Sequence, residues 1–115
     1  MDKFKSIINT YFYHFDSYND GKITFECDYG ELTFYKKNPK IITLFAIYIC
    51  PSFRQQGLCR DILYYIIDNA PYQFDYFCIK SVLSNILYDY LLRFSYNDTK
   101  FVNTIKGFYY PLREK

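Results

Sequence analysis

The chain has 115 residues, the length of one domain with a single hydrophobic core. Half of the residues are hydrophobic and 23% are charged, which excludes a disordered chain, and a net charge of +2 gives no reason to expect a nucleic-acid-binding protein. The unusual feature is an aromatic content of 23%, whose rings either fill the core or line a site. We therefore expect one domain over residues 1–115.

The sequence predicts an intracellular, cytoplasmic protein. Its longest apolar run, residues 41–50, is too short to span a bilayer as a helix, and the N-terminus lacks the apolar stretch of a signal peptide. The four cysteines form no CxxC pair and there is a single histidine, so neither a metal site nor a disulfide framework is expected. We expect reduced, mostly buried thiols, no metal and no membrane partner.

The N-terminal part of the chain predicts a helix followed by a hairpin. Apolar residues at helical spacing predict an amphipathic helix over residues 3–15. Strict alternation over residues 22–28 predicts a half-buried strand. A short loop at residues 28–30, where a glycine supplies a positive φ, leads to the partner strand over residues 31–37.

The middle of the chain predicts a buried strand followed by a helix. After a turn at residues 37–40, the apolar run over residues 41–50 predicts a central strand covered on both faces. Residues 57–69 have helical apolar spacing. Residues 72–80 predict a second buried strand.

The C-terminal part predicts a further helix and the last strands. Leu83 to Phe94 match helical spacing, with Ser84 as N-cap, and residues 101–102 and 107–112 predict short aromatic strands. The order of elements therefore predicts an α/β or α+β sandwich with helices packed on a mixed sheet.

One segment, residues 47–63, suggests chemistry. A buried strand ends, a tight loop follows, and a helix begins at Gly57, whose lack of a Cβ lets an anion approach the backbone. Free N–H groups and the helix dipole favour negative charge there, and Arg54 adds a cation, so the pattern predicts a phosphate or pyrophosphate cradle. The Walker lysine and the dinucleotide glycine spacing are both missing, which disfavours nucleoside triphosphate and NAD.

This segment resembles motif A of the GCN5-related N-acetyltransferase (GNAT) superfamily. The run Arg54-Gln55-Gln56-Gly57-Leu58-Cys59 fits Arg/Gln-x-x-Gly-x-Gly/Ala, with Ile49-x-Pro51 before it. Less sharply, the resemblance extends from Lys22 to the aromatic ending at residues 107–112. It implies a GNAT-like mixed, mostly antiparallel sheet flanked by helices.

The resemblance also implies an acetyl-CoA-dependent N-acetyltransferase. Backbone N–H groups from Gln55, Gln56, Gly57, Leu58 and Cys59 would bind the pyrophosphate of acetyl-CoA. The strand edge near Tyr48 and Ile49 would pair with the pantetheine arm. An amine acceptor, either a small molecule or a protein lysine or N-terminus, would attack the thioester directly. Tyr88 would act as the acid that protonates the leaving thiolate.

Departures from the family pattern leave alternatives open. Cys59 replaces a glycine or alanine, and we interpret it as a packing residue rather than a nucleophile, although a helix N-terminus lowers a thiol pKa. The central strand has no Asp or Glu, so the usual general base is missing, and Glu26, Glu31 and His14 remain as bases acting through water. Arg54 has an ordinary surface role as its alternative, and Tyr88 a structural one.

Two other functions stay open beside the acetyltransferase. The first is a catalytically inactive GNAT-fold binding or regulatory module that retains CoA binding. The second is single-stranded nucleic-acid binding by stacked rings and lysines. Exposed aromatic residues on the last strands would favour a homodimer.

Most of the aromatic excess is predicted to be core packing, because the chain has only two alanines to fill a small sandwich. The rings predicted on core faces are Phe4, Phe15, Phe25, Phe34, Phe45, Tyr65, Phe74, Tyr90 and Phe94. The rings left as functional candidates are Tyr48, Phe53, Tyr88 and those of residues 108–110.

Overall fold

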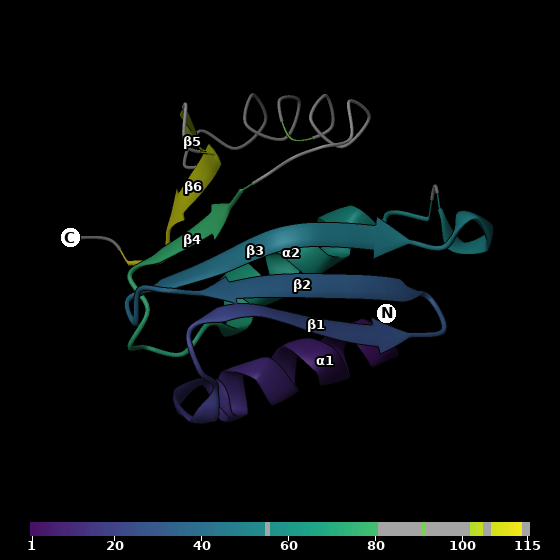
Figure 1. The fold of residues 1–115 in the computed structure, drawn as a ribbon. Coiled ribbons are helices and arrows are strands. Elements are labelled where there is room, and N and C mark those ends of the chain that lie inside the picture. The colour runs from purple at the N-terminus through teal and green to yellow at the C-terminus, as the bar shows by residue number, and fades with distance from the viewer. Residues whose placement is uncertain (55, 81–90, 92–101, 105–106, 114–115) are drawn as a thin grey trace.

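A computed structural model describes residues 1–54, 56–80, 91, 102–104 and 107–113 of the chain. Its elements in chain order (Figure 1) are α1 (Asp2–Tyr13), the 3-10 turn η1 (Phe15–Ser17), β1 (Gly21–Cys27), β2 (Gly30–Lys36), β3 (Ile41–Ile49), η2 (Pro51–Phe53), α2 (Leu58–Asn69), β4 (Tyr76–Ile79), β5 (Val102–Thr104) and β6 (Gly107–Pro111).

The strands form one six-stranded sheet in the order β1-β2-β3-β4-β6-β5. β3 and β4 are parallel and are joined through α2, whereas the other described neighbours pair antiparallel. The predicted mixed, mostly antiparallel sheet is confirmed. The predicted helix, hairpin, central strand and second helix also match α1, β1 with β2, β3 and α2 within about two residues at each end, the usual uncertainty of such boundaries.

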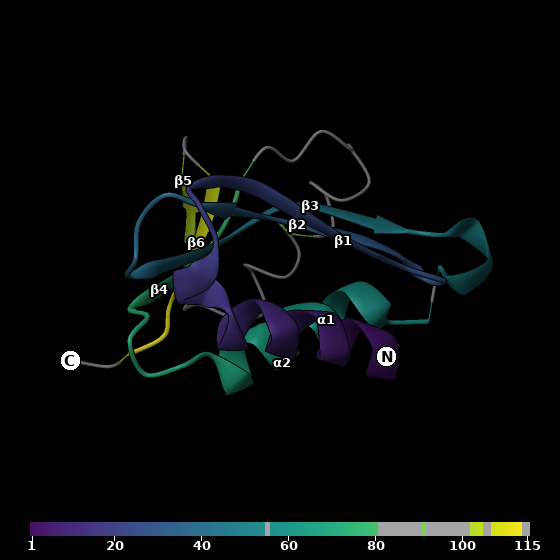
Figure 2. The same ribbon diagram turned by 60° about the horizontal axis from the view of Figure 1, so that its bottom comes forward.

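Both described helices pack under one face of the sheet, as Figure 2 shows. Tyr11 of α1 stacks on Phe34 of β2 with ring centroids 4.0 Å apart, and Phe15 meets Phe74 edge to face at 4.8 Å. These rings are buried. The interpretation of the aromatic excess as packing is therefore confirmed for Phe4, Phe15, Phe34 and Phe74, while Phe25 and Tyr65 pack partly buried against the same core.

The prediction for β3 is correct in the first half of the strand and wrong in the second. Ile42, Thr43 and Leu44 are buried, so this part is covered on both faces, but Ala46 and Tyr48 are exposed. The pairing with β2 shifts between Thr33 and Phe34, which leaves Phe45 as an extra, bulged residue.

Phe45 is not a core residue, contrary to the sequence-based prediction, because it directly follows the inward-facing Leu44. Phe45 lies on the sheet face opposite the helices, where it stacks on Tyr35 at 6.2 Å and lies under the ammonium of Lys22 at 4.1 Å. A single inserted residue changes which face the following side chains occupy, and periodicity alone does not reveal it.

The strand predicted over residues 72–80 is shorter than expected. β4 begins at Tyr76, because the preceding residues form a turn in which the Phe74 N–H donates to the Pro71 carbonyl at 3.1 Å. Phe74 is buried, and its side chain reaches the core from this turn rather than from β4.

The remaining predictions have mixed outcomes. The helix predicted over Leu83 to Phe94 lies outside the described residues except for Leu91, which is helical and buried. Phe108 and Tyr110 are buried, so these two rings supply no exposed surface for a homodimer. All four cysteines are unpaired, but Cys78 alone is buried and the other three are half-buried, so the prediction of mostly buried thiols is wrong. In the described part of the chain, no helix has both the length and the apolar character needed to cross a membrane.

Candidate functional site

The candidate site lies where the edge of β3 becomes free beside the start of α2. Parallel pairing between β3 and β4 ends at Leu44 and Ile79, and the Lys80 N–H donates to the Leu44 carbonyl at 3.1 Å as the last link. β3 continues to Ile49, while β4 diverges from it (Figure 1). From Phe45 onward, this edge of β3 has no strand partner among the described residues. As far as the described residues show, the backbone groups of this edge before the Ile49 carbonyl are without a strand partner, an arrangement suited to an extended ligand.

Arg54 lies at the end of this free edge. The Cys50 N–H donates to the Tyr29 carbonyl at 2.8 Å, so Cys50 faces the hairpin of β1 and β2. Because successive residues of a strand alternate, Ile49 faces the opposite, free edge. Arg54 Nε donates to the Ile49 carbonyl at 2.8 Å, and its guanidinium carbon lies 5.6 Å from the centroid of the Tyr48 ring. The backbone and the exposed Tyr48 thus hold this cation beside the strand edge.

Gly57 forms the start of α2. It has φ 75° and ψ 13°, a left-handed conformation that favours glycine, and as N-cap it offers no side-chain hydrogen bond. The Asp61 N–H donates to the Gly57 carbonyl at 3.0 Å, whereas the N–H groups of the first turn have no acceptor within the helix. Together with the positive end of the helix dipole, these donors form a cradle suited to an anion.

A second cation, which sequence reasoning missed, closes over this cradle. A Cβ built on Gly57 would lie 2.9 Å from Nη2 of Arg60, so the guanidinium occupies the space that the glycine leaves. The exposed pair between Arg60 and Asp61, at 3.4 Å, is too weak to hold Arg60 there permanently. The sequence signal that could have identified Arg60 was a basic residue in the first turn of a helix that begins at glycine.

The loop between β3 and α2 is anchored by the hairpin of β1 and β2. Tyr29 and Phe53 pack edge to face with centroids 4.4 Å apart. Lys3 of α1 pairs with Asp28 and lies over the Tyr29 ring at 5.5 Å. Phe53, one of the rings left as functional candidates, is thus a structural contact of the loop, and Tyr29 is a positioning residue that sequence reasoning did not select.

Cys59 is half-buried against the hydrophobic core. Burial raises the pKa of its thiol to about 12, so the thiol is protonated at neutral pH. The pKa is raised by desolvation, not lowered as a helix N-terminus alone would do. A neutral, packed thiol favours the packing role over nucleophilic catalysis.

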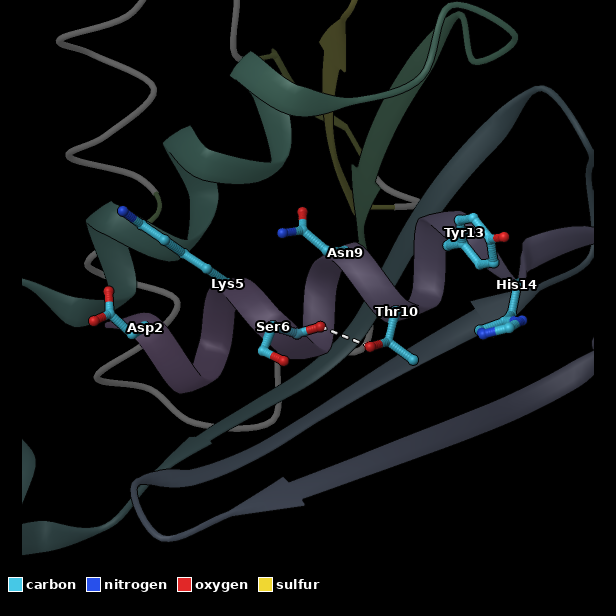
Figure 3. A pocket seen from close by; sticks show the side chains of 7 residues that line it. All are labelled: Asp2, Lys5, Ser6, Asn9, Thr10, Tyr13 and His14. Atoms are coloured by element: carbon cyan, nitrogen blue, oxygen red, sulfur yellow. Dashed lines mark hydrogen bonds between the residues drawn. The ribbon is translucent and has the colours of Figure 1, made fainter.

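The three candidate bases differ in position. His14 is exposed at the C-terminal end of α1, against Tyr13, in a hollow of about 550 Å³ over the outer face of this helix. Figure 3 shows Asp2 and His14 at opposite ends of α1. Since Lys3 contacts the hairpin loop, His14 lies roughly 16 Å away along the helix.

Glu31 is better placed than either alternative. It pairs in register with Tyr48 on one side and with Glu26 on the other, so all three share the face of the sheet opposite the helices. Glu31 is half-buried and one strand from the free edge, whereas Glu26 is exposed and a strand further away.

Other predicted site residues are placed as follows. Gln56 is exposed, and Leu58 is buried so that its backbone alone can face the cradle. Gln55 and Tyr88 lie outside the described residues. Among the residues with described positions, no cluster of three or more histidine, cysteine or acidic side chains could hold a metal ion.

Comparison with known proteins supports the fold. No family model matches the sequence, and no curated protein matches it. A solved structure, the acetyltransferase of the GNAT family from Staphylococcus aureus Mu50, is similar with a TM-score of 0.54 at 14% sequence identity. The match covers 74% of this chain and 60% of that chain, so this chain spans less than two thirds of its neighbour's length. The likeness, at this level of identity, concerns the fold: this chain has a GNAT-like fold.

Proposed function

We propose that this chain is an acetyl-CoA-dependent N-acetyltransferase. The observation that carries the proposal is the juxtaposition of the free edge of β3 with the uncapped start of α2 at Gly57. One element offers backbone groups to an extended arm, and the other offers N–H donors and two arginines to phosphates. The neighbouring solved structure is named an acetyltransferase, which agrees with this reading.

The residues around the cradle fit a pyrophosphate. The N–H groups of residues 55–59 would hold its oxygens, and the missing Cβ of Gly57 allows close approach. Arg60 would move from above Gly57 onto the phosphates, and Arg54 would supply charge from the side of the strand. Backbone groups near Tyr48 and Ile49 would pair with the pantetheine arm, with Arg54 giving up the Ile49 carbonyl where the arm needs it.

The reaction is a direct transfer. The acceptor nitrogen attacks the thioester carbonyl, a C–N bond forms, the C–S bond breaks, and the sulfur leaves as a thiolate. Glu31, through one water, is our choice for the base that takes the proton from nitrogen, because it shares a face with Tyr48. Tyr88 remains our choice for the acid that protonates the sulfur. Acetyl-CoA brings the activated acyl group, and the chain positions it and moves the protons.

Calorimetric titration with acetyl-CoA tests the proposal, followed by mass spectrometry of reaction products with a panel of amines. We expect binding that Arg54→Ala weakens, and turnover that Glu31→Gln lowers by about a hundredfold while leaving acetyl-CoA affinity unchanged. Glu26→Gln is the matched control with the same charge change and should retain most turnover.

Failure to bind acetyl-CoA at millimolar concentration would reject the proposal. Binding without acetylation of any amine would instead favour the non-catalytic module that the missing carboxylate in the central strand suggests.

A further inference from the structure

A pocket of about 350 Å³ lies on the sheet face opposite α1 and α2. Its floor is a row of side chains from three adjacent strands, because Thr43 pairs in register with Cys78, and Cys78 with Tyr109. The residues on either side of them along each strand point into the core instead: Ile42, Leu44, Phe77, Ile79, Phe108 and Tyr110. The pocket is therefore separate from the packing of the helices.

The floor of this pocket is neutral. The Cys78 thiol and the Tyr109 hydroxyl are hydrogen-bond partners, and burial raises the pKa of that thiol. Thr43 carries no charge and is almost fully buried. No negative charge is therefore expected on the floor at neutral pH.

The rim of the pocket is cationic. Lys37, from the turn before β3, and Lys80, after β4, are its two charged residues, and no carboxylate lines it within the described part of the chain. Neither ammonium has an ion-pair partner among the residues that the structure describes. The Tyr35 ring forms an aromatic wall of the pocket and stacks on the Phe45 ring. Two cations without a described ion-pair partner, above a neutral floor, favour an anionic ligand and repel a polycation.

The pocket reaches the free edge of β3. Thr43 and Cys78 immediately precede the last paired residues, Leu44 and Ile79. The Lys80 N–H makes the final link to Leu44, so the Lys80 side chain leaves the chain at the point where the two strands separate. A molecule held in the pocket would thus extend toward the edge that, under the proposed function, receives the thioester.

We propose that this pocket binds the anionic group of the acceptor, which is a small amine that also carries a carboxylate or a phosphate. Identifying the ligand as the acceptor rests on the proposed acetyltransferase function. The preference for an anion follows from the residues of the pocket alone. Its volume suits a small molecule. The pocket selects against polyamines and lysine-rich peptides, which bring further positive charge to Lys37 and Lys80.

Matched acceptors test the proposal with the full chain and acetyl-CoA. Tyrosine is compared with tyramine, and phosphoethanolamine with ethanolamine, so that each pair differs in the anionic group and identifies which anion is preferred. We expect at least about a tenfold higher kcat/KM for one anionic member, expressed mainly in KM. Lys37→Met and Lys80→Met should each reduce this ratio toward one. Lys40→Met, in the same turn but not lining the pocket, should leave it unchanged.

Direct binding separates this proposal from the proposed function. Saturation-transfer NMR without acetyl-CoA compares N-acetyltyrosine with N-acetyltyramine, and phosphoethanolamine with ethanolamine. Tighter binding of an anionic member, lost in Lys37→Met and Lys80→Met, supports the anion site even if no amine is acetylated and the proposed function fails. Equal binding in both pairs, or a preference that survives both lysine variants, overturns the anion site whatever the outcome for catalysis.

Discussion

Gly30 of β2 lies directly against the backbone of Tyr48 in β3. A Cβ at Gly30 would be 2.8 Å from the Tyr48 carbonyl carbon and closer still to its oxygen. Gly30 has φ 151° and pairs with Ile49, next to the Cys50 N–H bond to the Tyr29 carbonyl. The hairpin of β1 and β2 thus fixes the end of β3 at the point where the candidate site begins.

Gly30→Ala should disrupt this approach. Backbone, rather than a flexible side chain, occupies the space of the new Cβ, so the strands must separate, and we expect the free energy of unfolding to fall by about 2–4 kcal/mol. Chemical denaturation measures it. Gly21→Ala, with φ 125° and no atom within 4 Å of the Cβ, is the control for conformational strain alone and should lose less. Equal losses in the two variants would contradict the contact.

Gly57→Ala should weaken acetyl-CoA binding by about tenfold. The left-handed conformation costs alanine about 1 kcal/mol, and the Cβ displaces the Arg60 guanidinium and narrows the cradle. Calorimetric titration gives the affinity. Gly21→Ala should lose stability by a comparable amount while keeping its affinity, and a parallel loss of affinity there would mean that the effect at Gly57 is only destabilisation.

Arg54→Gln and Arg60→Gln should each lower acetyl-CoA affinity, by about fivefold to tenfold, with a weaker dependence on salt concentration. Under the proposed function, each variant removes one cation that would face the phosphates, and the contribution of such a cation is screened by ions. Arg113 pairs with Asp75 away from the cradle, so Arg113→Gln is the control with the same change of charge. If all three variants behave alike, net charge rather than a local contact sets the affinity.

Tyr11→Phe should raise the free energy of unfolding by about 1 kcal/mol. The Tyr11 hydroxyl is buried and has no hydrogen-bond partner among the described residues, so its removal relieves a desolvation cost. Thermal unfolding measures the change. Tyr65→Phe removes a hydroxyl that donates to Asn9 Oδ1 at 2.7 Å and should instead lower stability by about 0.5–1 kcal/mol. A destabilised Tyr11→Phe would indicate a partner for this hydroxyl.

Cys59→Ala should retain acetyl transfer, and the wild-type protein should acquire no acetyl mass from acetyl-CoA. Burial raises the pKa of the thiol from 9.0 to about 12. Between pH 9.0 and about pH 12, the folded chain therefore keeps a proton that the unfolded chain releases. Stability therefore falls as the pH rises through this interval, and the fall should be shallower in Cys59→Ala. Denaturation at several alkaline pH values checks the slope, and an acetylated Cys59 would refute direct transfer.

The sequence determined the order of elements because the patterns behind it are local. Alternation over β1, the continuous apolar run of β3 and the helical spacing of α2 each fix a structure by which faces are buried. The sequence predicted that α2 begins at Gly57, and the structure adds that this glycine has the left-handed conformation that residues with a Cβ rarely adopt. In the same way, resemblance over residues 54–59 predicted the GNAT-like fold that the solved acetyltransferase shares.

Tertiary structure alone decided the rest, because it depends on contacts between residues distant in the sequence. The bulge at Phe45 turned Ala46 outward and Ile47 toward the core, since register depends on the partner strand. The burial of Cys59 raises the pKa of its thiol, which only the packing around it could show. The separation of β3 from β4 after Leu44 placed Lys80 beside Lys37 at the rim of one pocket. Periodicity in the sequence shows which residues face the core. Only the tertiary structure decides which of the outward-facing residues lie close together in one pocket.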